Sequence, residues 1–311
     1  MRIEQFTQLM TIVQEKSMTK AANKLNISQP ALSLSMKKLE DDLGFQIFNK
    51  VGRTLNLTYQ GEEVYLSAKR IVNEIEVMEN ICQNHEEDKH TLNISNSFSV
   101  LAKDNLIETF KQYKKGHVTC RFEDCSITQS IDNVYTGISE IGIIRYPAYK
   151  QNYLNKIFES KNIECSVMVY EPACVVAGKE NPLYHIDADT INYQHIQSFP
   201  FITYVNEVQD NIWMSFLKDL NIDYSRISLA NVGQVIETVK NTDLLFIDTR
   251  KDHTHSDWYD INQIRYIQIE PTVRCALAYI KLKNRQLSDI GQTYIKLLEK
   301  RIGIWQMKKN T

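Results

Sequence analysis

The sequence predicts an α+β protein of three parts: a small helical head with a two-stranded wing, a long linker helix, and a two-lobed α/β body. Three observations support this prediction. The head shows three short helical apolar patterns followed by two alternating segments. A proline-free stretch with a heptad-like apolar repeat follows. Beyond it, strand-like and helix-like segments alternate, which is typical of parallel sheets covered by helices.

The composition is that of a globular protein and excludes several other classes. The chain has 311 residues, 43% hydrophobic and 24% charged, with 10 Gly and 6 Pro. This length favours two or three domains with apolar cores of their own. No run of about 18 uncharged apolar residues occurs, and the N-terminus lacks a secretory signal. We therefore expect a cytoplasmic protein with no membrane contact.

The cysteines predict reduced, mostly buried thiols. They show no Cys-x-x-Cys pair and no zinc-ligand spacing. Two of them, Cys120 and Cys125, are close enough in sequence for a redox pair, and the sequence leaves this alternative open. The six are Cys82, Cys120, Cys125, Cys165, Cys174 and Cys275.

Charge is distributed unevenly along the chain. Residues 1–58 contain eight basic and five acidic groups, a net charge of +3, within a chain of net charge −2. The remainder therefore carries −5. A basic head on an acidic body indicates that the head is the part that meets a polyanion.

Three helices are predicted in the head. Residues 3–16 show apolar side chains at helical spacing. Ser17 and Thr19 supply cap chemistry for a short second helix, and Ser28 caps a third helix that ends at Gly44.

The third helix carries the clearest functional pattern of the head. Its apolar stripe predicts one buried face, and the opposite face presents short polar groups, one leucine and one lysine. Such a face fits a DNA major groove, because Ser and Gln can bond base edges or phosphates and Leu can contact a thymine methyl group. From periodicity alone, a merely solvated face explains the pattern equally well. The outward side chains are Gln29, Pro30, Ser33, Leu34 and Lys37.

Residues 45–58 predict a short two-stranded wing after the third helix. The segment alternates, turns at residues 51–53, and alternates again. Lys50 and Arg53 lie near the tip, where basic side chains can reach backbone phosphates beside the groove.

Residues 1–61 closely resemble the winged helix-turn-helix of LysR-type transcriptional regulators. The resemblance rests on five stretches in one order: Ser17–Leu25, Ile27–Ser33, Lys38–Gly44, Ile47–Phe48 and Leu57–Gly61. It implies that the head binds double-stranded DNA. The residues expected to contact DNA are Thr19, Ser28, Gln29, Pro30, Ser33, Leu34, Lys37, Lys50 and Arg53.

Residues 59–88 are expected to form a linker and dimerisation helix. Apolar residues recur with spacing 4-3-4-3-4, which is the seam of a short coiled coil. The alternative is an amphipathic helix packed on its own chain. LysR-type proteins are similar here, and the resemblance implies a homodimer whose pairs assemble into a homotetramer. The expected seam residues are Val64, Ala68, Ile71, Ile75 and Met78, and the hinge to the body is expected at residues 84–90.

Residues 89–311 predict a two-lobed body. Lobe I is expected at about 91–162 and 267–311, and lobe II at about 163–266, because the final strand and helix return to the first lobe. This element order resembles the periplasmic-binding-protein-like effector domain of LysR-type regulators. The resemblance implies a small-molecule effector in the cleft between the lobes.

Polar residues that follow the predicted strands are the candidate effector site, since ligands of such folds bind beyond the carboxyl ends of strands. Hydroxyls, an amide and an arginine suit a small carboxylate. The alternative is that Arg145 pairs internally with Glu140 or Asp248 and that no ligand binds. The candidates are Ser97, Ser99, Ser126, Thr128, Arg145, Thr203 and Asn231.

Rival functions find little support in the sequence. No nucleophile elbow, P-loop, dinucleotide fingerprint or zinc-protease motif occurs, so we expect no enzyme and no cofactor. His253, His255 and Asp257 lie in a polar segment, and we expect no metal site there. A free-standing solute-binding protein would need a secretory signal. A ligand-responsive transcription factor explains both ends of the chain, and an effector-independent or redox-responsive regulator of the same fold is the alternative.

Overall fold

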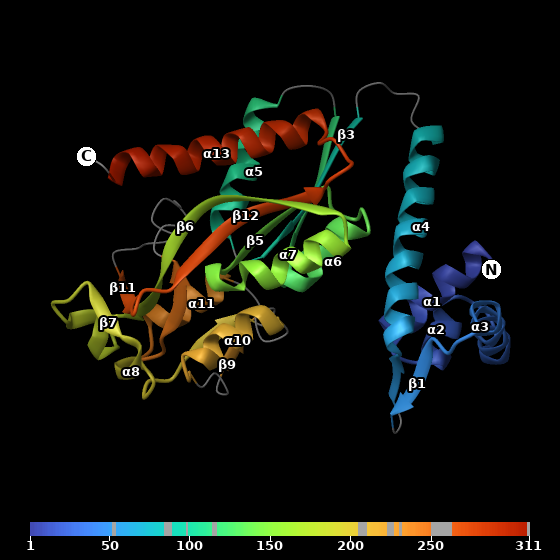
Figure 1. Cartoon of the computed structure of the whole chain (residues 1–311), viewed down its shortest axis with the longest axis horizontal. Coiled ribbons are helices and arrows are strands. Elements are labelled where there is room, and N and C mark those ends of the chain that lie inside the picture. Colours follow the sequence, from blue (N-terminus) through green and yellow to red (C-terminus); the bar gives the residue numbers. More distant parts are fainter. Residues whose placement is uncertain are drawn as a thin grey trace. The chain divides into compact units, whose positions relative to one another are not determined.

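In the computed structural model the chain forms two compact units (Figure 1). The first consists of Met1–Glu87 with Thr136–Ile138, and the second of Asp88–Tyr135 with Ser139–Thr311. Among the described residues, no helix is long and apolar enough to span a membrane. The structure describes residues 1–51, 54–83, 89–97, 99–113, 117–204, 210–222, 227–229, 232–249 and 263–309.

Three helices form the core of the N-terminal unit, as predicted: α1 (Ile3–Glu15), α2 (Met18–Lys24) and α3 (Gln29–Leu43). Both predicted caps form. The Ser17 hydroxyl accepts a hydrogen bond from the Lys20 N–H, and the Ser28 hydroxyl accepts one from the Ala31 N–H. Gly44 ends α3 with a φ of 80°, a left-handed conformation that costs glycine little.

The wing and the linker helix complete this unit. Strands β1 (Phe48–Val51) and β2 (Thr54–Leu57) pair antiparallel, and α4 (Tyr59–Gln83) follows directly. The Glu40 carboxylate at the end of α3 accepts hydrogen bonds from the backbone N–H groups of Ile47 and Phe48, at 2.8 and 3.3 Å. The wing is thereby attached to the third helix.

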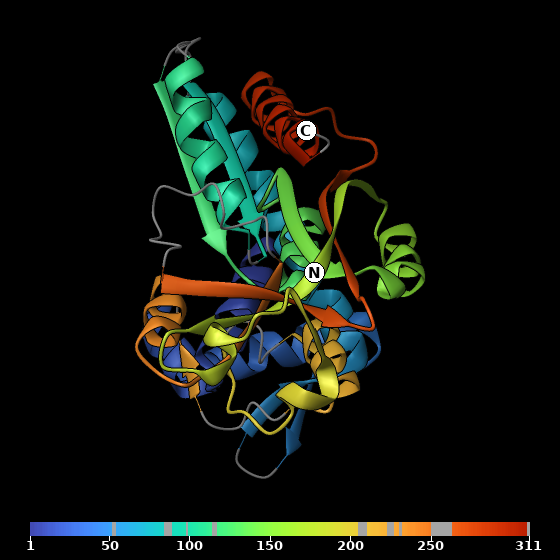
Figure 2. The ribbon, with the colours of Figure 1, turned by 90° about the vertical axis from the view of Figure 1, so that its left-hand side faces the viewer.

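The body is built on one eight-stranded sheet that runs through both lobes (Figure 2). In lobe I, β3 (Lys89–Asn96) pairs in parallel with β4 (His117–Asp124) and with β5 (Ile141–Pro147), as predicted. Strand β12 (Arg274–Leu282) then lies antiparallel between β5 and β6 (Ile163–Gly178). The late part of the chain thus returns to lobe I, in the centre of its sheet.

Lobe I has helices on both faces of its sheet. Helices α5 (Val100–Gln112) and α13 (Asp289–Lys309) cover one face, and α6 (Ile127–Tyr135) and α7 (Gln151–Ser160) cover the other. Alternate residues of β5 point to opposite faces, and both sets are buried. This explains why the strand is apolar at every position except Arg145 instead of alternating.

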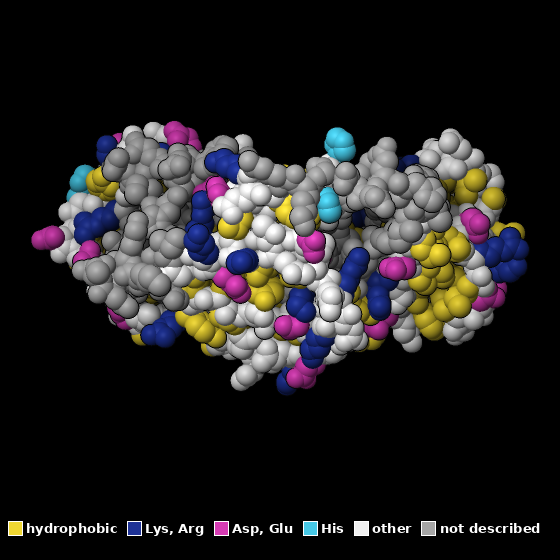
Figure 3. Space-filling view, turned by 90° about the horizontal axis from the view of Figure 1, so that it is seen from above, with side chains coloured by type: hydrophobic (Ala, Val, Ile, Leu, Met, Phe, Trp, Pro, Cys, Tyr) yellow, Lys and Arg dark blue, Asp and Glu magenta, His cyan; other side chains and the backbone are white. Residues whose placement is uncertain are grey.

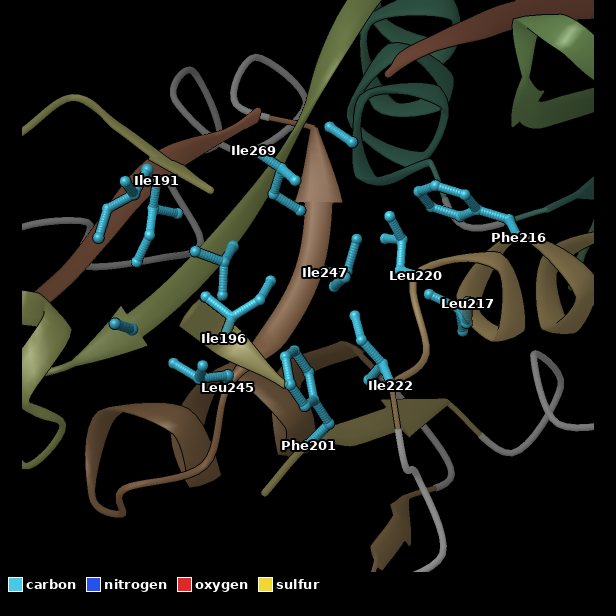
Figure 4. Close-up of a cluster of buried hydrophobic side chains, with 14 of the residues drawn as sticks. Ile191, Ile196, Phe201, Phe216, Leu217, Leu220, Ile222, Leu245, Ile247 and Ile269 are labelled. Carbon is cyan, nitrogen blue, oxygen red and sulfur yellow. The ribbon is translucent and has the colours of Figure 1, made fainter. Parts of the chain in front are cut away.

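Lobe II is assembled around the second half of β6. This strand is 16 residues long and pairs with β12 in lobe I and with β10 and β11 in lobe II. Ala173, Val175 and Ala177 face the apolar cluster of Figure 4, whereas Cys174 and Val176 face a second cluster around α11. The strand therefore joins the two lobes through continuous backbone pairing.

The remaining elements complete lobe II and its connections. Strand β8 pairs in parallel with β9, and β7 pairs in parallel with β11. The elements are η1 (Ala148–Lys150), η2 (Pro182–His185), β7 (Thr190–Asn192), α8 (Tyr193–Ile196), β8 (Ile202–Tyr204), α10 (Asn211–Asp219), β9 (Ile227–Leu229), α11 (Val232–Lys240), β10 (Phe246–Thr249) and β11 (Ile264–Glu270).

Replacement of Gly61 tests the close packing of α4 on the N-terminal unit. A Cβ atom at Gly61 would stand 2.1 Å from the Ile47 carbonyl oxygen, so the backbone would have to shift. We expect Gly61→Ala to lower the free energy of unfolding of this unit by about 1–3 kcal/mol, measured by thermal denaturation. At Gly303 in α13 nothing lies within 4 Å of the new methyl group. Gly303→Ala should be neutral or stabilising by up to about 1 kcal/mol. Equal effects of the two changes would contradict this packing.

Candidate nucleic-acid interface and ligand site

The rotation of α3 is set by its buried stripe. Leu32, Met36 and Leu39 are buried in one cluster with residues of α1 and α2, including Leu9 and Ala21. The opposite face of α3 is therefore turned to the solvent. Gln29, Pro30, Ser33, Leu34 and Lys37 are all exposed.

Leu34 is the most unusual residue of this exposed face. Its side chain is 70% exposed in the middle of a helix whose Leu32, Met36 and Leu39 are buried. An exposed leucine surrounded by short polar residues adds nothing to the domain core. It is available for an apolar contact with a partner.

A polar contact that the sequence analysis missed holds α3 against α1. The Ser35 hydroxyl bonds to Gln8 Oε1 at 2.5 Å, and Gln5 Nε2 donates to the Ser35 carbonyl oxygen at 3.0 Å. Two glutamines spaced i, i+3 on an amphipathic helix were the available signal. These bonds support the orientation of the exposed face without belonging to it.

The other predicted DNA contacts lie beside α3 or outside the described side chains. Thr19 is exposed in the first turn of α2. Ser28 is exposed as well, and its oxygen is engaged as the helix cap. Arg53 and the side chain of Lys50 lie outside what the structure describes. Figure 3 shows basic and acidic side chains interspersed on the face it presents.

The residues of the predicted dimer seam on the linker helix fall into a buried group and a more exposed group. Ala68 is 1% exposed and belongs to the core cluster of its own unit, and Val64 packs against that cluster. These two positions are therefore used within the chain, which corrects the prediction of an unbroken seam from Val64 to Met78. Ile71 and Met78 are 41% and 60% exposed, and Ile75 is half-buried.

Most predicted effector-site hydroxyls lie at helix N-termini. The Ser99 hydroxyl caps α5 through the Ala102 N–H, and the Ser126 hydroxyl accepts from the Gln129 N–H in the first turn of α6. Ser97 is fully buried, and its hydroxyl has no hydrogen-bond partner among the described residues. Thr128 is exposed and Thr203 is buried, while Asn231 lies outside the described residues.

A second residue that the sequence analysis missed orders this edge of lobe I. The buried Asn96 side chain donates hydrogen bonds to Asp124 Oδ1 at 2.8 Å and to the Ser99 carbonyl oxygen at 3.0 Å. It thereby connects the ends of β3 and β4 to the start of α5. A polar residue at the end of an apolar strand is the sequence signal for such a position.

Arg145 is engaged inside the protein, which corrects its assignment as an anion contact. Its guanidinium donates to the Asp248 carboxylate, and the two side chains are only 6% and 2% exposed. Burial alone would lower the pKa of Arg145, but Asp248 and Glu171 together raise it above its ordinary value. Glu140, the other predicted partner, instead accepts hydrogen bonds from Ser288.

Four of the described cysteines have thiol pKa values raised by burial. Burial raises the pKa of Cys120 and Cys165 to about 11, and that of Cys125 and Cys275 to about 12. At pH 7 the thiolate fraction is then about one part in 10⁴ or less, and the thiolate is the reactive form. The five cysteines described are unpaired thiols.

Within the described ranges, no group of three His, Cys, Asp or Glu side chains is placed to hold a metal ion. His253, His255 and Asp257 lie outside these ranges.

Comparison with known proteins assigns the N-terminal unit to a family. Residues 3–62 match the model of the bacterial regulatory helix-turn-helix protein, lysR family. The chain is 40% identical over 77 residues to the HTH-type transcriptional regulator BsdA of Bacillus subtilis (strain 168). That match covers 24% of this chain and 27% of BsdA, so the chain spans about a quarter of the length of this relative.

Two further comparisons extend over most of the chain. It is 23% identical over 250 residues to the HTH-type transcriptional regulator CysB of Haemophilus influenzae, covering 79% of this chain and 71% of CysB. The crystal structure of CbnR, a LysR family transcriptional regulator, superimposes with a TM-score of 0.59 at 15% identity and covers 97% of this chain and 99% of CbnR. The latter likeness shows a shared fold.

The chain therefore combines a helix-turn-helix unit with a two-lobed α/β body. Residues 3–62 thus belong to the lysR family of bacterial regulatory helix-turn-helix proteins, and the chain as a whole is similar to LysR-type transcriptional regulators.

The buried Arg145–Asp248 pair should be costly to break. Arg145→Met leaves Asp248 buried without its partner, and we expect the free energy of unfolding to fall by about 3–5 kcal/mol. The double change Arg145→Met with Asp248→Asn should recover part of that loss. As a control, Lys281→Met removes the 2.7 Å pair with Glu164, whose carboxylate is 45% exposed, and should cost about 1 kcal/mol or less. Equal losses for Arg145→Met and Lys281→Met, in chemical denaturation, would contradict a buried pair.

Proposed function

We propose that this protein binds double-stranded DNA through α3 and the wing and regulates transcription in response to a small molecule. The exposed face of α3 carries the proposal, above all the 70% exposed Leu34 beside Ser33 and Lys37. A solved structure of CbnR, of 15% identity and TM-score 0.57, is described as complexed with its target DNA. That description supports the same activity here.

The chemistry of the face suits the major groove of DNA. The N-terminus of α3 presents backbone N–H groups and a positive dipole end, which favour a phosphate beside Gln29. Ser33 can bond a base edge and Leu34 can contact a thymine methyl group, and both contacts distinguish base pairs. Lys37 is placed one turn further along the same face. Thr19, Ser28, Lys50 and Arg53 are assigned to the DNA backbone.

The two kinds of contact predict different binding defects. Lys50→Ala or Arg53→Ala should weaken binding to every sequence and flatten the salt dependence by about one unit per lost phosphate contact. Ser33→Ala or Leu34→Ala should change the preferred base by roughly 1–3 kcal/mol at one step of the site. Binding is measured on the selected site and on random DNA over a range of salt concentrations.

Lys283→Ala provides the charge-matched control. Lys283 is exposed in the effector domain, so this change removes one positive charge away from the proposed interface. It should leave affinity and salt dependence unchanged. An equal loss on selected and random DNA for the α3 and wing variants alike would refute the division of roles.

A homodimer formed through α4 follows from the proposed function, and we assign its seam to Ile71, Ile75 and Met78. The exposed Ile71 and Met78 lie on one face of the helix with Ile75 between them. Two DNA-binding units on one particle would bind two half-sites with avidity. Pairing of two such dimers would give the homotetramer.

Charges placed in the seam should separate the dimer. Ile71→Lys with Met78→Lys should shift the protein toward monomer in sedimentation and weaken binding to a two-half-site DNA, because avidity is lost. Arg70 is exposed and lies about 100° around the helix axis from Ile71. Arg70→Glu should therefore leave the assembly intact. A dimer that persists in the double variant would show that α4 does not form the interface.

For the effector we propose a small polar molecule at the carboxyl ends of the lobe strands. The buried Ser97 hydroxyl, which lacks a described partner, supports this position, since such groups are rare without a function. Thr203 is the middle residue of the short strand β8 in lobe II. Ser99, Ser126 and Thr128 lie at the helix starts of lobe I. Thermal-shift screening of small polar metabolites tests the proposal, because a ligand at 100 times its Kd stabilises the protein by about 2.7 kcal/mol.

A further inference from the structure

Asp210 is a fully buried carboxylate at the start of α10 in lobe II. One of its oxygens, Oδ1, accepts hydrogen bonds from the backbone N–H groups of Ile212 at 2.8 Å and Trp213 at 3.1 Å. These two donors belong to the first turn of α10. On this side Asp210 therefore acts as the N-cap of its own helix.

The second carboxylate oxygen of Asp210 bonds to lobe I. Oδ2 accepts a hydrogen bond of 2.5 Å from the backbone N–H of Ile127, the first residue of α6 in lobe I. The backbone of Thr128 also donates to this carboxylate. Asp210 and Ile127 are 83 residues apart in sequence. One side chain thus receives backbone donors from helix N-termini of both lobes.

Helix α10 is attached to lobe I at two further points. The buried Ile212 side chain belongs to the lobe I cluster that contains Ile131 and Tyr146. At the far end of the helix, Asp219 accepts a hydrogen bond of 2.7 Å from the Tyr149 hydroxyl. The helix therefore contacts lobe I near both of its ends. Of the two carboxylates that make these contacts, Asp210 is buried and Asp219 is exposed.

The surroundings of Asp210 are those of an anion site. Helices α6 and α10 have nine residues each, and both begin after the carboxyl end of a strand, where ligands of doubly wound folds bind. Each N-terminus carries a partial positive charge and N–H groups that have no partner within the helix. The described donors to Asp210 are all backbone N–H groups. Desolvation raises the pKa of Asp210, and these hydrogen bonds oppose the rise.

We propose that the Asp210 carboxylate is a built-in anion that joins the two lobes of the effector domain. It occupies the position in which the N-termini of α6 and α10 would otherwise bind the carboxylate of a small molecule. The lobes are then held together by the chain itself, and the anion site between the helix N-termini becomes open to a small monocarboxylate when this side chain is removed. The inference goes beyond the proposed function and does not depend on DNA binding.

Chemical rescue of the full-length Asp210→Ala variant tests the proposal, with formate and acetate as probes. The variant should melt roughly 4 °C or more below the wild type, because a helix cap and the bond between the lobes are lost together. Formate or acetate at 100 mM should raise its melting temperature by about 2 °C or more. Sodium chloride at equal concentration and the neutral analogues formamide and acetamide should not. A folded variant that responds equally to salt, amide and carboxylate would overturn the proposal.

Asp219→Ala is the matched control, since it removes the other carboxylate bond between α10 and lobe I. Asp219 is exposed and receives a side-chain hydroxyl instead of helix N-termini. This variant and the wild type should show no carboxylate-specific stabilisation. Carboxylate-specific stabilisation of either one would place the anion site elsewhere and overturn the proposal.

If Asp210→Ala does not fold, Asp210→Asn provides a second test. An amide has one acceptor oxygen, so it cannot serve both helix N-termini. Hydrogen exchange of the peptide that begins α6 should then become about tenfold faster than in the wild type. Unchanged protection of Ile127 and Thr128 in Asp210→Asn would overturn the proposal.

Discussion

Burial of one stripe of α3 is the constraint on which the N-terminal unit depends. Leu32, Met36 and Leu39 can enter the core only at one rotation of the helix. That rotation turns Ser33, Leu34 and Lys37 outward, and the bonds from α1 to Ser35 support it. The face proposed to read DNA is thus positioned by packing on the opposite side. The same core takes up Ala68, so the linker helix starts in a fixed orientation to the helices it follows.

The body depends on a different constraint, the continuity of β6. Because this strand pairs with β12 in one lobe and with β10 and β11 in the other, the lobes share one sheet. Side-chain contacts between the lobes then gather around it, with Arg145 on β5 bonded to Asp248 on β10. The guanidinium of Arg145 is thereby engaged in a buried ion pair within the chain.

Local features were predictable from the sequence and long-range ones were not. Helix caps at Ser17 and Ser28 and the buried strand β5 follow from residue type and periodicity. The partner of Arg145 is 103 residues away, and charge alone left Glu140 and Asp248 equally suitable. The heptad pattern of α4 indicated an apolar face but not what covers it, which is why Ala68 was assigned to a dimer seam. Ser35 was missed because side-chain bonds between helices require knowledge of their crossing.

Methylation protection by dimethyl sulfate tests the central claim most directly, because this reagent modifies guanine N7 in the major groove and adenine N3 in the minor groove. The full chain is bound to DNA recovered from its native genome. If α3 of each subunit enters the major groove, guanine N7 should be protected in two patches. These patches should be separated by about one helical turn or a multiple of it. Protection confined to adenine N3, or no protected base on DNA that the protein binds, would contradict recognition by α3.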